Sequence, residues 1–510
     1  MNKPLILILT SAMVAACGLL AAAESSPAPL ALQRVANQDN LKQHAAPWEE
    51  HGKLRVAANG RYVEHADGTP MLWIADTGWA LFYKLRREDI VAYLDARSRQ
   101  GFNVIQAVAY WYPHGEDGPG PTNAANQYGH APFEGGADEP DTSRPKVVDG
   151  GSPDEPNDYW DHADFIVRET RRRGLYLAML PCWGRAYINP QMSGSARVVF
   201  DAEQARTYGR FLGRRYGNEP HLVWVLGGDA NATAGAPGEQ FHVYRAMAEG
   251  IGQGVTGRQL HWNQRDEGWD DVLMTYHPDG APAYNSSNWF HGDAWLDFNG
   301  IETWKSIDKV YETVVRDYAR QDPTKPTMLL EGAYEQGKYP SPGDRISAHK
   351  ARQQAYHTFF AGGVGHTYGG FPVWDFTRDP KNDVYQHTWR DAMTFPGAPQ
   401  VATILRRLLD ENQWWKLSPH PAAITGDPGR GQSQVVAMRS ASGDRILIYL
   451  PTSRPVKVKL DLTGSAKVTA RWFDPRDGRQ TPAGEHAIGS TVEFKIPEDW
   501  EDAVLICLKP

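Results

Sequence analysis

The sequence predicts an α/β protein: a (β/α)8 TIM barrel followed by a small antiparallel β-sandwich domain. Three observations support this prediction. Short apolar runs alternate with helix-like stretches through most of the chain. Near residue 420 the pattern changes to short alternating strands divided by Gly-Asp and Asp-Gly turns. The length of 510 residues suffices for a barrel, which takes roughly 250 residues or more, and one appended domain.

The barrel strands are expected where an apolar run is bounded by turn residues or ends on a polar residue. We expect the eight strands at residues 71–75, 102–108, 175–180, 221–226, 259–262, 271–277, 327–331 and 363–368. The connection between the fifth and sixth runs is too short for a full helix, so this pair departs from the regular βα pattern. A small hairpin around Asn59-Gly60 is expected before the barrel.

Helices are expected between the strands, where apolar residues recur at helical spacing. Asp201 is a typical N-cap for one of them, and Gly217 is typical of a helix end. We expect helices at residues 86–100, 160–173, 201–216, 239–251, 304–320 and 344–360. Residues 112–158 are instead rich in Gly, Pro, Asn and Asp. Because this long segment follows a barrel strand, we expect it to form a wall or lid over the C-terminal face.

The N-terminus has the features of a bacterial export signal. Lys3 precedes an apolar run too short to span a membrane as a structural helix, and we assign residues 1–23 to a signal peptide. Val14-Ala15-Ala16-Cys17 resembles a lipobox, which makes Cys17 the expected lipidation site; ordinary cleavage after Ala23 is the alternative. We expect the remaining parts to be a linker at 24–50, the barrel at 51–418 and the sandwich domain at 419–510.

The composition is that of an ordinary globular protein and argues against some partners. The net charge of -8, with Lys and Arg dispersed among acids, disfavours nucleic-acid binding, which needs a basic patch. Cys182 and Cys507 are expected to be buried, unpaired thiols. The sequence has no CxxC or HExxH pattern, and we expect neither a metal nor a cofactor. The 18 Trp and 22 Tyr suit stacking on sugar rings, although large barrels also use aromatic residues in their cores.

Two acids follow apolar runs that belong to different strands. Asp229 comes after the fourth run and two glycines, and Glu331 ends the seventh, 331 − 229 = 102 residues later. Taken singly, an acid at a strand end is more often a cap or an ion-pair partner. At the C-terminal face of one barrel, however, two such carboxylates are the minimal machinery for hydrolysing a glycosidic bond. We predict Asp229 as general acid/base and Glu331 as nucleophile, or as base if the enzyme inverts.

Other residues near strand ends could bind a sugar. Polar side chains could hydrogen-bond hydroxyl groups, and indole rings could stack on sugar faces. The polar candidates are Asp76, Gln106, His277, His366 and Tyr368, and the aromatic ones are Trp79, Trp111, Trp183 and Trp374. The alternative is that the polar residues are satisfied within the protein and that some of the tryptophans belong to the core.

Several motifs resemble those of a known family, the apiosidase-like glycoside hydrolases (family 140). They are Asp-Gly-Thr-Pro at 67–70, Trp-Ile-Ala-Asp-Thr-Gly-Trp at 73–79, Gly-Phe-Asn-Val-Ile-Gln at 101–106, Trp-Val-Leu-Gly-Gly-Asp at 224–229, Tyr-His-Pro at 276–278 and Trp-Phe-Asp-Pro-Arg at 472–476. The resemblance covers nearly all of the chain after the linker. The sequence departs from it at Ala230, where relatives often carry Arg, and after Asn299, where Gly-Ile-Glu-Thr-Trp replaces an expected Gln-Ser-Gly-His.

The resemblance implies a TIM barrel that acts on pectic side chains of plant cell walls, in the characterised case by cleaving apiose linkages in rhamnogalacturonan II. The catalytic Asp and Glu of the family map onto Asp229 and Glu331. The C-terminal module of the family carries a collagen-binding label, which is weak support for binding collagen.

Together these features predict an exported bacterial glycoside hydrolase of the cell envelope, periplasm or medium. Its expected partner is a polysaccharide or oligosaccharide substrate, with no nucleic acid, and with a membrane only through a lipid on Cys17. The alternative is a non-catalytic carbohydrate-binding or adhesion lipoprotein on the same barrel. Because Asp229 and Glu331 are both present, we favour the enzyme.

Overall fold

The computed structural model describes residues 45–111, 121–189, 198–232, 240–281, 284–338, 344–380, 384–464 and 466–509. The predicted signal peptide, Cys17 and residues 24–44 of the predicted linker lie outside these ranges. The last residues of that linker belong to the folded body. They form α1 (Pro47–Glu50), whose buried Trp48 packs with ring centroids 5.2 Å from Tyr176 and 5.1 Å from His221. Burial of this indole ring orders a segment whose composition alone looked like a tether.

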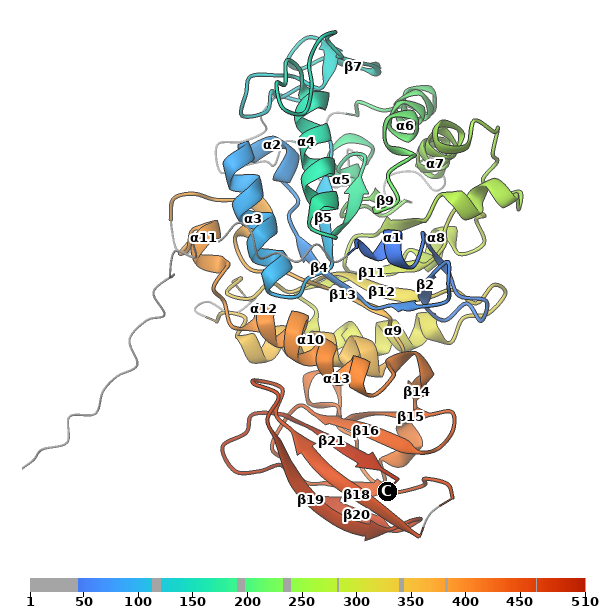
Figure 1. Cartoon of the computed structure of the whole chain (residues 1–510), viewed down its shortest axis with the longest axis vertical. Coiled ribbons are helices and arrows are strands. Elements are labelled where there is room, and N and C mark those ends of the chain that lie inside the picture. The colour runs from blue at the N-terminus through green and yellow to red at the C-terminus, as the bar shows by residue number, and fades with distance from the viewer. Residues whose placement is uncertain are drawn as a thin grey trace, which may run out of the picture. The chain divides into compact units, whose positions relative to one another are not determined.

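The central sheet has eight parallel strands, as the sequence predicts (Figure 1). They are β4 (Trp73–Thr77), β5 (Val104–Val108), β8 (Tyr176–Leu180), β9 (Leu222–Gly227), β10 (Met274–His277), β11 (Asn299–Trp304), β12 (Thr327–Gly332) and β13 (Gly365–Tyr368). Their hydrogen-bonded order is β10-β9-β8-β5-β4-β13-β12-β11. Hydrogen bonds that involve side chains join β10 to the segment just before β11 and so connect the two ends of this order. The Met274 N–H donates to Asp297 at 2.8 Å, and Thr275 Oγ1 donates to the Phe298 carbonyl at 2.6 Å. The predicted barrel is confirmed.

Two of the predicted strands need correction. Residues 259–262 form no strand, because the Trp262 N–H donates to Glu249 of the preceding helix and the Trp262 ring stacks under Arg245. The fifth strand is β10, within the run predicted as the sixth. The true sixth strand is β11, whose sequence Asn-Gly-Ile-Glu-Thr-Trp has no apolar run. Only the tertiary contacts of its buried residues identify it as a barrel strand.

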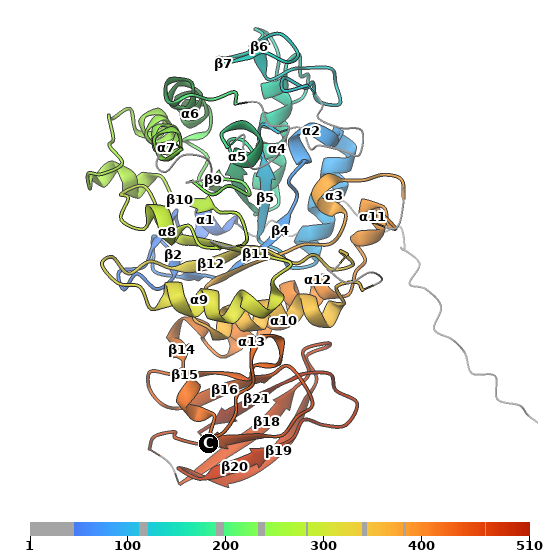
Figure 2. The same ribbon diagram turned by 180° about the vertical axis from the view of Figure 1, so that it is seen from behind.

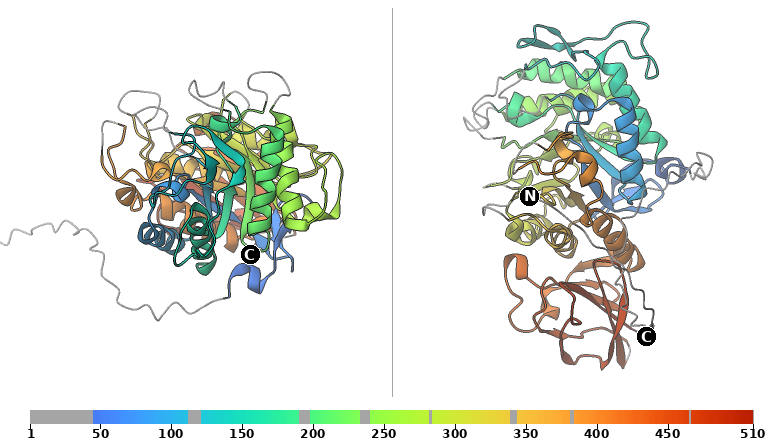
Figure 3. Two further views of the ribbon diagram at one scale, coloured as in Figure 1. Left: turned by 90° about the horizontal axis from the view of Figure 1, so that it is seen from above. Right: turned by 90° about the vertical axis from the view of Figure 1, so that its left-hand side faces the viewer.

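Helices surround the barrel where apolar spacing predicts them (Figures 1 and 3). The main ones are α3 (Arg87–Arg99), α4 (Tyr159–Arg172), α6 (Ala202–Tyr216), α7 (Phe241–Thr256), α9 (Val310–Tyr318) and α10 (Ala348–Phe360). Asp201 caps α6 as predicted, accepting from the Gln204 N–H at 2.8 Å, while the Gln204 side chain accepts from the Asp201 N–H at 2.9 Å. This reciprocal capping box satisfies two donors that a helix start leaves unpaired.

Short elements complete the barrel. They are the sheet β1 (Leu54–Val56), β2 (Val63–His65), β3 (Pro70–Met71), the hairpin β6 (Phe133–Gly135), β7 (Pro140–Pro145), and the helices α2 (Leu81–Lys84), α5 (Gly184–Tyr187), α8 (Ser287–Phe290), α11 (Trp389–Ala392), α12 (Gly397–Pro399) and α13 (Arg406–Glu411). The hairpin lies in the long segment predicted as a wall or lid. Its Phe133 is buried and held by Asn123, and the Pro132 carbonyl accepts from the Trp160 indole at 2.9 Å. No described helix is long and apolar enough to cross a membrane.

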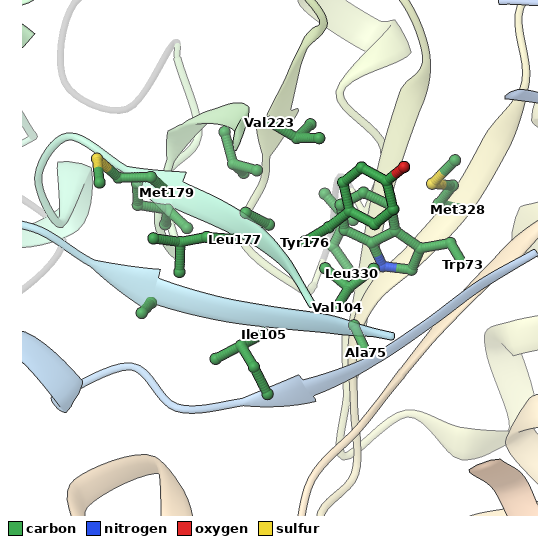
Figure 4. Close-up of a cluster of buried hydrophobic side chains, with 14 of the residues drawn as sticks. Trp73, Ala75, Val104, Ile105, Tyr176, Leu177, Met179, Val223, Met328 and Leu330 are labelled. Atoms are coloured by element: carbon green, nitrogen blue, oxygen red, sulfur yellow. The ribbon is translucent and has the colours of Figure 1, made fainter. Parts of the chain in front are cut away.

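The barrel core consists of side chains from strands far apart in the sequence. Figure 4 shows Trp73 beside Leu330 and Met328, with Ile105, Leu177 and Val223 contributed by neighbouring strands. All of these are at most 1% exposed. Helices bury the outer face of the sheet as well, which explains why most strands read as continuous apolar runs rather than alternating ones.

The C-terminal part forms two antiparallel sheets, as predicted. The strands are β14 (Leu417–Pro419), β15 (Val436–Ser440), β16 (Arg445–Leu450), β17 (Val456–Lys459), β18 (Lys467–Phe473), β19 (Gln480–Ala487), β20 (Thr491–Phe494) and β21 (Ala503–Leu508). Six of them pair in the order β14-β15-β16-β21-β18-β19, and β17 pairs with β20. The two sheets enclose a core that includes Ile448, Val458 and Cys507. Cys182 and Cys507 are both buried and unpaired, as expected.

The other face of the six-stranded sheet packs on α10, which lies beside α9 (Figure 2). Tyr449 of β16 stacks on Tyr356 of α10 with ring centroids 4.4 Å apart. Beside this stack, Arg352 of α10 forms a fully buried ion pair with Asp502, with Nη2 2.6 Å from Oδ1, and the Tyr449 hydroxyl donates to Asp502 at 2.9 Å. The barrel and the C-terminal sheet therefore share one buried interface.

We expect Arg352→Ala to lower the free energy of unfolding by about 3–5 kcal/mol, because it leaves the Asp502 carboxylate buried without its counter-charge. Urea and thermal unfolding of the whole chain measure this loss. Arg168→Ala, which removes an arginine paired with the exposed Asp154, is the matched control and should change stability little. Equal effects of the two substitutions would contradict the importance of the buried pair.

Candidate active site

A cavity of about 560 Å³ opens at the C-terminal ends of the barrel strands, where TIM barrels carry their active sites. Two carboxylates and a set of aromatic rings line it. The lining residues are Trp79, Trp111, Trp183, Arg185, Ala186, Asp229, Trp304, Lys305, Glu331, Ala333, Tyr334, Gly337, Lys338, Ile346, Phe371, Trp374 and Val384. Asp229 and Glu331, the acids singled out in the sequence, thus face the same space.

The backbone after β9 turns sharply to present Asp229. Gly227, Gly228 and Asp229 have φ angles of 89°, 100° and 45°, all in the left-handed region. A Cβ atom on Gly227 would lie 2.2 Å from the His277 carbonyl oxygen, so the neighbouring strand leaves room only for glycine. Asp229 itself is a non-glycine residue in this region, and such a strained backbone is typical of functional sites.

Glu331 is held by two neighbours at the end of β12, Tyr334 and His277. The Tyr334 hydroxyl donates to Oε1, and the Trp79 indole donates in turn to the Tyr334 hydroxyl at 2.8 Å. His277 Nε2 lies 3.1 Å from Oε2, an ion-pair contact rather than an aligned hydrogen bond. Glu331 is only 5% exposed, so this chain of contacts fixes its carboxylate toward the cavity.

A third carboxyl group joins the pair, and sequence reasoning missed it. Glu302 of β11 is 2% exposed, and its Oε2 lies 3.7 Å from His277 Nδ1. Donor atoms of Asp229, His277, Glu302 and Glu331 all lie within 4.8 Å of one another, the one such group among the described residues close enough together to surround a metal ion. In the sequence, Glu302 is marked only as a lone acid between Ile301 and Thr303, in the segment that departs from the family pattern.

Burial and mutual repulsion shift the protonation of this cluster. Burial and the neighbouring Glu331 carboxylate raise the pKa of Asp229 to about 7. Burial, and then the neighbouring carboxyl groups of Asp229 and Glu331, raise the pKa of Glu302 well above its usual range. Burial would lower the pKa of His277, but the Glu331 carboxylate outweighs it and the net shift is upward. Two carboxyl groups of the site, those of Asp229 and Glu302, therefore hold their protons to higher pH than ordinary carboxyl groups do.

The four predicted tryptophans all line the cavity. Trp111 and Trp183 are stacked with centroids 4.8 Å apart, Trp374 lies 6.1 Å from Trp111, and Trp79 lies 5.3 Å from Trp183. Trp304, which is 48% exposed at the rim, was not predicted as a site residue. The rings form a continuous aromatic wall of the kind that flat apolar ligand faces pack against.

Four of the predicted polar residues lie away from the cavity. Asp76 points at α3 and is bound there by Arg97 at 2.8 Å and Tyr93 at 2.6 Å. Two others form hydrogen bonds within the protein: Gln106 donates to the Leu330 carbonyl, and Tyr368 donates to Glu335. His366 is 2% exposed, and burial lowers its pKa to about 3. Their expected contact with substrate is corrected here to a structural role. His277 instead contacts the catalytic candidates.

The described part of the long segment, residues 121–158, also does not line the cavity. Its hairpin packs on α4 and α6 instead, through contacts such as the one from Trp160 to Pro132. Residues 112–120 lie outside the described ranges. Trp111, which directly precedes this segment, lines the cavity.

Comparisons with known proteins agree with this geometry. Residues 57–416 match the family described as "Apiosidase-like, catalytic domain", and residues 419–508 match the "Putative collagen-binding domain of a collagenase". A search of curated proteins finds no match.

Solved structures are similar along nearly the whole chain. One named "Glycoside hydrolase" is 27% identical with a TM-score of 0.75, and the match covers 91% of this chain and 98% of that one. A family 5 glycoside hydrolase from Bacteroides vulgatus is 26% identical with a TM-score of 0.76, covering 91% and 95%. Because the family match spans well over half of the sequence, the chain belongs to the apiosidase-like family and is a glycoside hydrolase.

Proposed function

We propose that this glycosidase cleaves glycosidic bonds in pectic side chains of plant cell walls, with Asp229 as general acid/base and Glu331 as nucleophile. One observation carries the assignment of the two residues. Their carboxylate oxygens come within 4.8 Å of each other in an aromatic-lined cavity, and their surroundings differ. Burial raises the pKa of Asp229 to about 7, whereas Glu331 accepts a hydrogen bond from Tyr334 and contacts His277. Two carboxyl groups that differ in this way can divide acid and nucleophile roles at one pH.

The proposed reaction proceeds in two displacements. In the first, a Glu331 oxygen bonds to the anomeric carbon while Asp229 gives its proton to the departing glycosidic oxygen, forming a glycosyl-enzyme. In the second, Asp229 takes a proton from water, whose oxygen displaces Glu331 and regenerates both carboxyl groups. Tyr334 and His277 orient Glu331 for the attack. Retaining enzymes place these groups about 5–5.5 Å apart, and inverting enzymes about 6.5–9.5 Å, so the short spacing here favours retention.

The pectic substrate class is supported by the family and by the cavity rim. Lys305 and Lys338 line the cavity of a protein whose net charge is -8, and Arg185, which pairs with Asp279 at 3.3 Å, lines it as well. Cations gathered at one opening favour an anionic ligand, and pectic chains carry acidic sugars. The tryptophan wall would stack on the faces of the rings.

Export and anchoring also belong to the proposal. A lipid on Cys17 would hold the enzyme at the cell envelope through residues 24–44, where extracellular polysaccharide is accessible. With hydrolysis by two carboxylates, neither a metal nor an organic cofactor is required.

We expect Asp229→Asn and Glu331→Gln each to reduce kcat for pectic oligosaccharides by about 10²–10⁴-fold or more, because each removes a group that acts on the reacting bond. A screen of wild type and variants against defined pectic oligosaccharides, with identification of the released sugar, measures this and names the substrate. Asp154→Asn, at an exposed carboxylate that pairs with Arg168, is the control. Wild-type turnover in both site variants would refute the assignment, and binding without hydrolysis by wild type would favour the non-catalytic alternative.

Retention of anomeric configuration is the second expectation. Proton NMR of the sugar formed in the first moments of hydrolysis should show the anomer of the substrate, before mutarotation mixes the two forms. The physical reason is the short distance between the carboxylates, which leaves no room for a water molecule between the nucleophile and the sugar. The opposite anomer would make Glu331 a general base.

The pH dependence follows from the pKa of Asp229. The general acid must be protonated, and its pKa is raised to about 7, so kcat/KM should be high below this pH and fall as pH rises through it. A pH–rate profile on an oligosaccharide measures this limb. The limb should weaken for an aryl glycoside with a good leaving group, which departs without a proton. An activity that rises through pH 7 would exclude Asp229 as the acid.

A further inference from the structure

Glu302 is buried at the centre of the site, yet the two-displacement mechanism does not use it. It pairs in register with Glu331 across the β11–β12 ladder, because the register shifts between Ile301 and Glu302. This shift brings two acids of adjacent strands to the same edge of the cavity. Burying a carboxyl group beside others is costly, so its presence in a reactive site calls for a function.

The groups around Glu302 come from every strand that packs against it. His277 of β10 is 3.7 Å away, Glu331 projects from β12, Asp229 follows β9, and Asp279 follows β10. A carboxyl oxygen of Glu302 lies within 4.8 Å of one of Asp229. Glu302 Oε2 and Asp229 Oδ1 are both buried without a hydrogen-bond partner among the described residues. Three carboxyl groups and one imidazole thus surround it. A further negative charge at this point would be repelled, so a neutral carboxylic acid is the form that fits.

We propose that Glu302 is a positioning residue that, as a neutral carboxylic acid, donates a hydrogen bond to the Asp229 carboxylate formed when Asp229 protonates the leaving oxygen. The inference rests on the proposed function of Asp229. In the first displacement the proton of Asp229 moves to the glycosidic oxygen, and the new charge remains on Asp229. Glu302 keeps its own proton throughout and shares it through the hydrogen bond.

Such a bond is strongest after the proton has left Asp229, because an ionised acceptor binds a donor more tightly than a neutral one. Glu302 therefore stabilises the transition state more than the bound substrate, which is the condition for raising kcat. The raised pKa of Glu302 agrees with this neutral role. An ionised Glu302 would do the opposite, since its charge would oppose ionisation of Asp229.

The direct test is a pH titration of Asp229 in wild type, Glu302→Gln and Glu302→Leu. The carbon-13 NMR signal of the Asp229 carboxyl group reports its protonation. Gln keeps a neutral donor, so the midpoint should stay as in wild type. Leu removes the donor, so the midpoint should rise by about one unit or more. A fall of the midpoint in both variants would show that Glu302 is an anion and would overturn the proposal. Glu312→Gln, on the exposed side of α9, is the matched control.

This titration needs no turnover, so it decides the role of Glu302 even if no pectic substrate is hydrolysed. Kinetics then separate positioning from mere folding. Glu302→Gln should keep kcat within about threefold of wild type, whereas Glu302→Leu should lose about 10-fold or more on the oligosaccharide and less on a nitrophenyl glycoside of the same sugar. Thermal unfolding checks that both variants fold.

Two kinetic outcomes would overturn the inference. The first is a loss in Glu302→Gln as large as in Glu302→Leu, which would require a charged Glu302. The second is a wild-type activity that a chelator abolishes and a divalent cation restores, which would make the cluster a metal site.

Discussion

Electrostatic crowding is the constraint on which the active site depends. Asp229, which is half-buried, lies close to the buried Glu302 and Glu331 and a single imidazole. No arrangement there can ionise all three acids at low cost. Tyr334 and His277 make favourable contacts with Glu331. Asp229 has burial and the repulsion of Glu331 instead, and these raise its pKa. A division of roles between two chemically similar side chains thus follows from their unequal surroundings.

The fold supplies this crowding through the barrel. Strands β9, β10, β11 and β12 end at one face, so acids more than a hundred residues apart in the sequence meet at their tips. The glycines before Asp229 and the register shift beside Glu302 are local departures from regular strand geometry. Both occur at the site, where irregular backbone aims side chains that an ideal strand would not present.

The C-terminal sheet acts as part of the same body. One face of this six-stranded sheet packs against β17 and β20 around a small core. The other face packs on α10 through Tyr449 and the buried pair of Arg352 and Asp502. Helix α10 in turn contacts β12 and β13, and Gln354 on it accepts from the Ala333 N–H just after Glu331. A continuous set of packed elements therefore joins the distal sheet to the strand of the proposed nucleophile, so the sheet can support the barrel whatever it binds.

Much of this could be predicted from the sequence, because the signals are local. Apolar runs fixed seven of the eight strand positions to within a few residues, the two strand-end acids were found from their places after such runs, and the cap at Asp201 was recognised from residue type. What only the tertiary structure decided was pairing and direction. Strand β11 has no apolar run and is a strand because its neighbours bury it. Asp76 pairs with Arg97 and does not face the cavity. A shift of register places Glu302 opposite Glu331. The periodicity of apolar residues can be read from the sequence. The distance between two side chains depends on which strands pair and in which register, and packing across the whole barrel determines both.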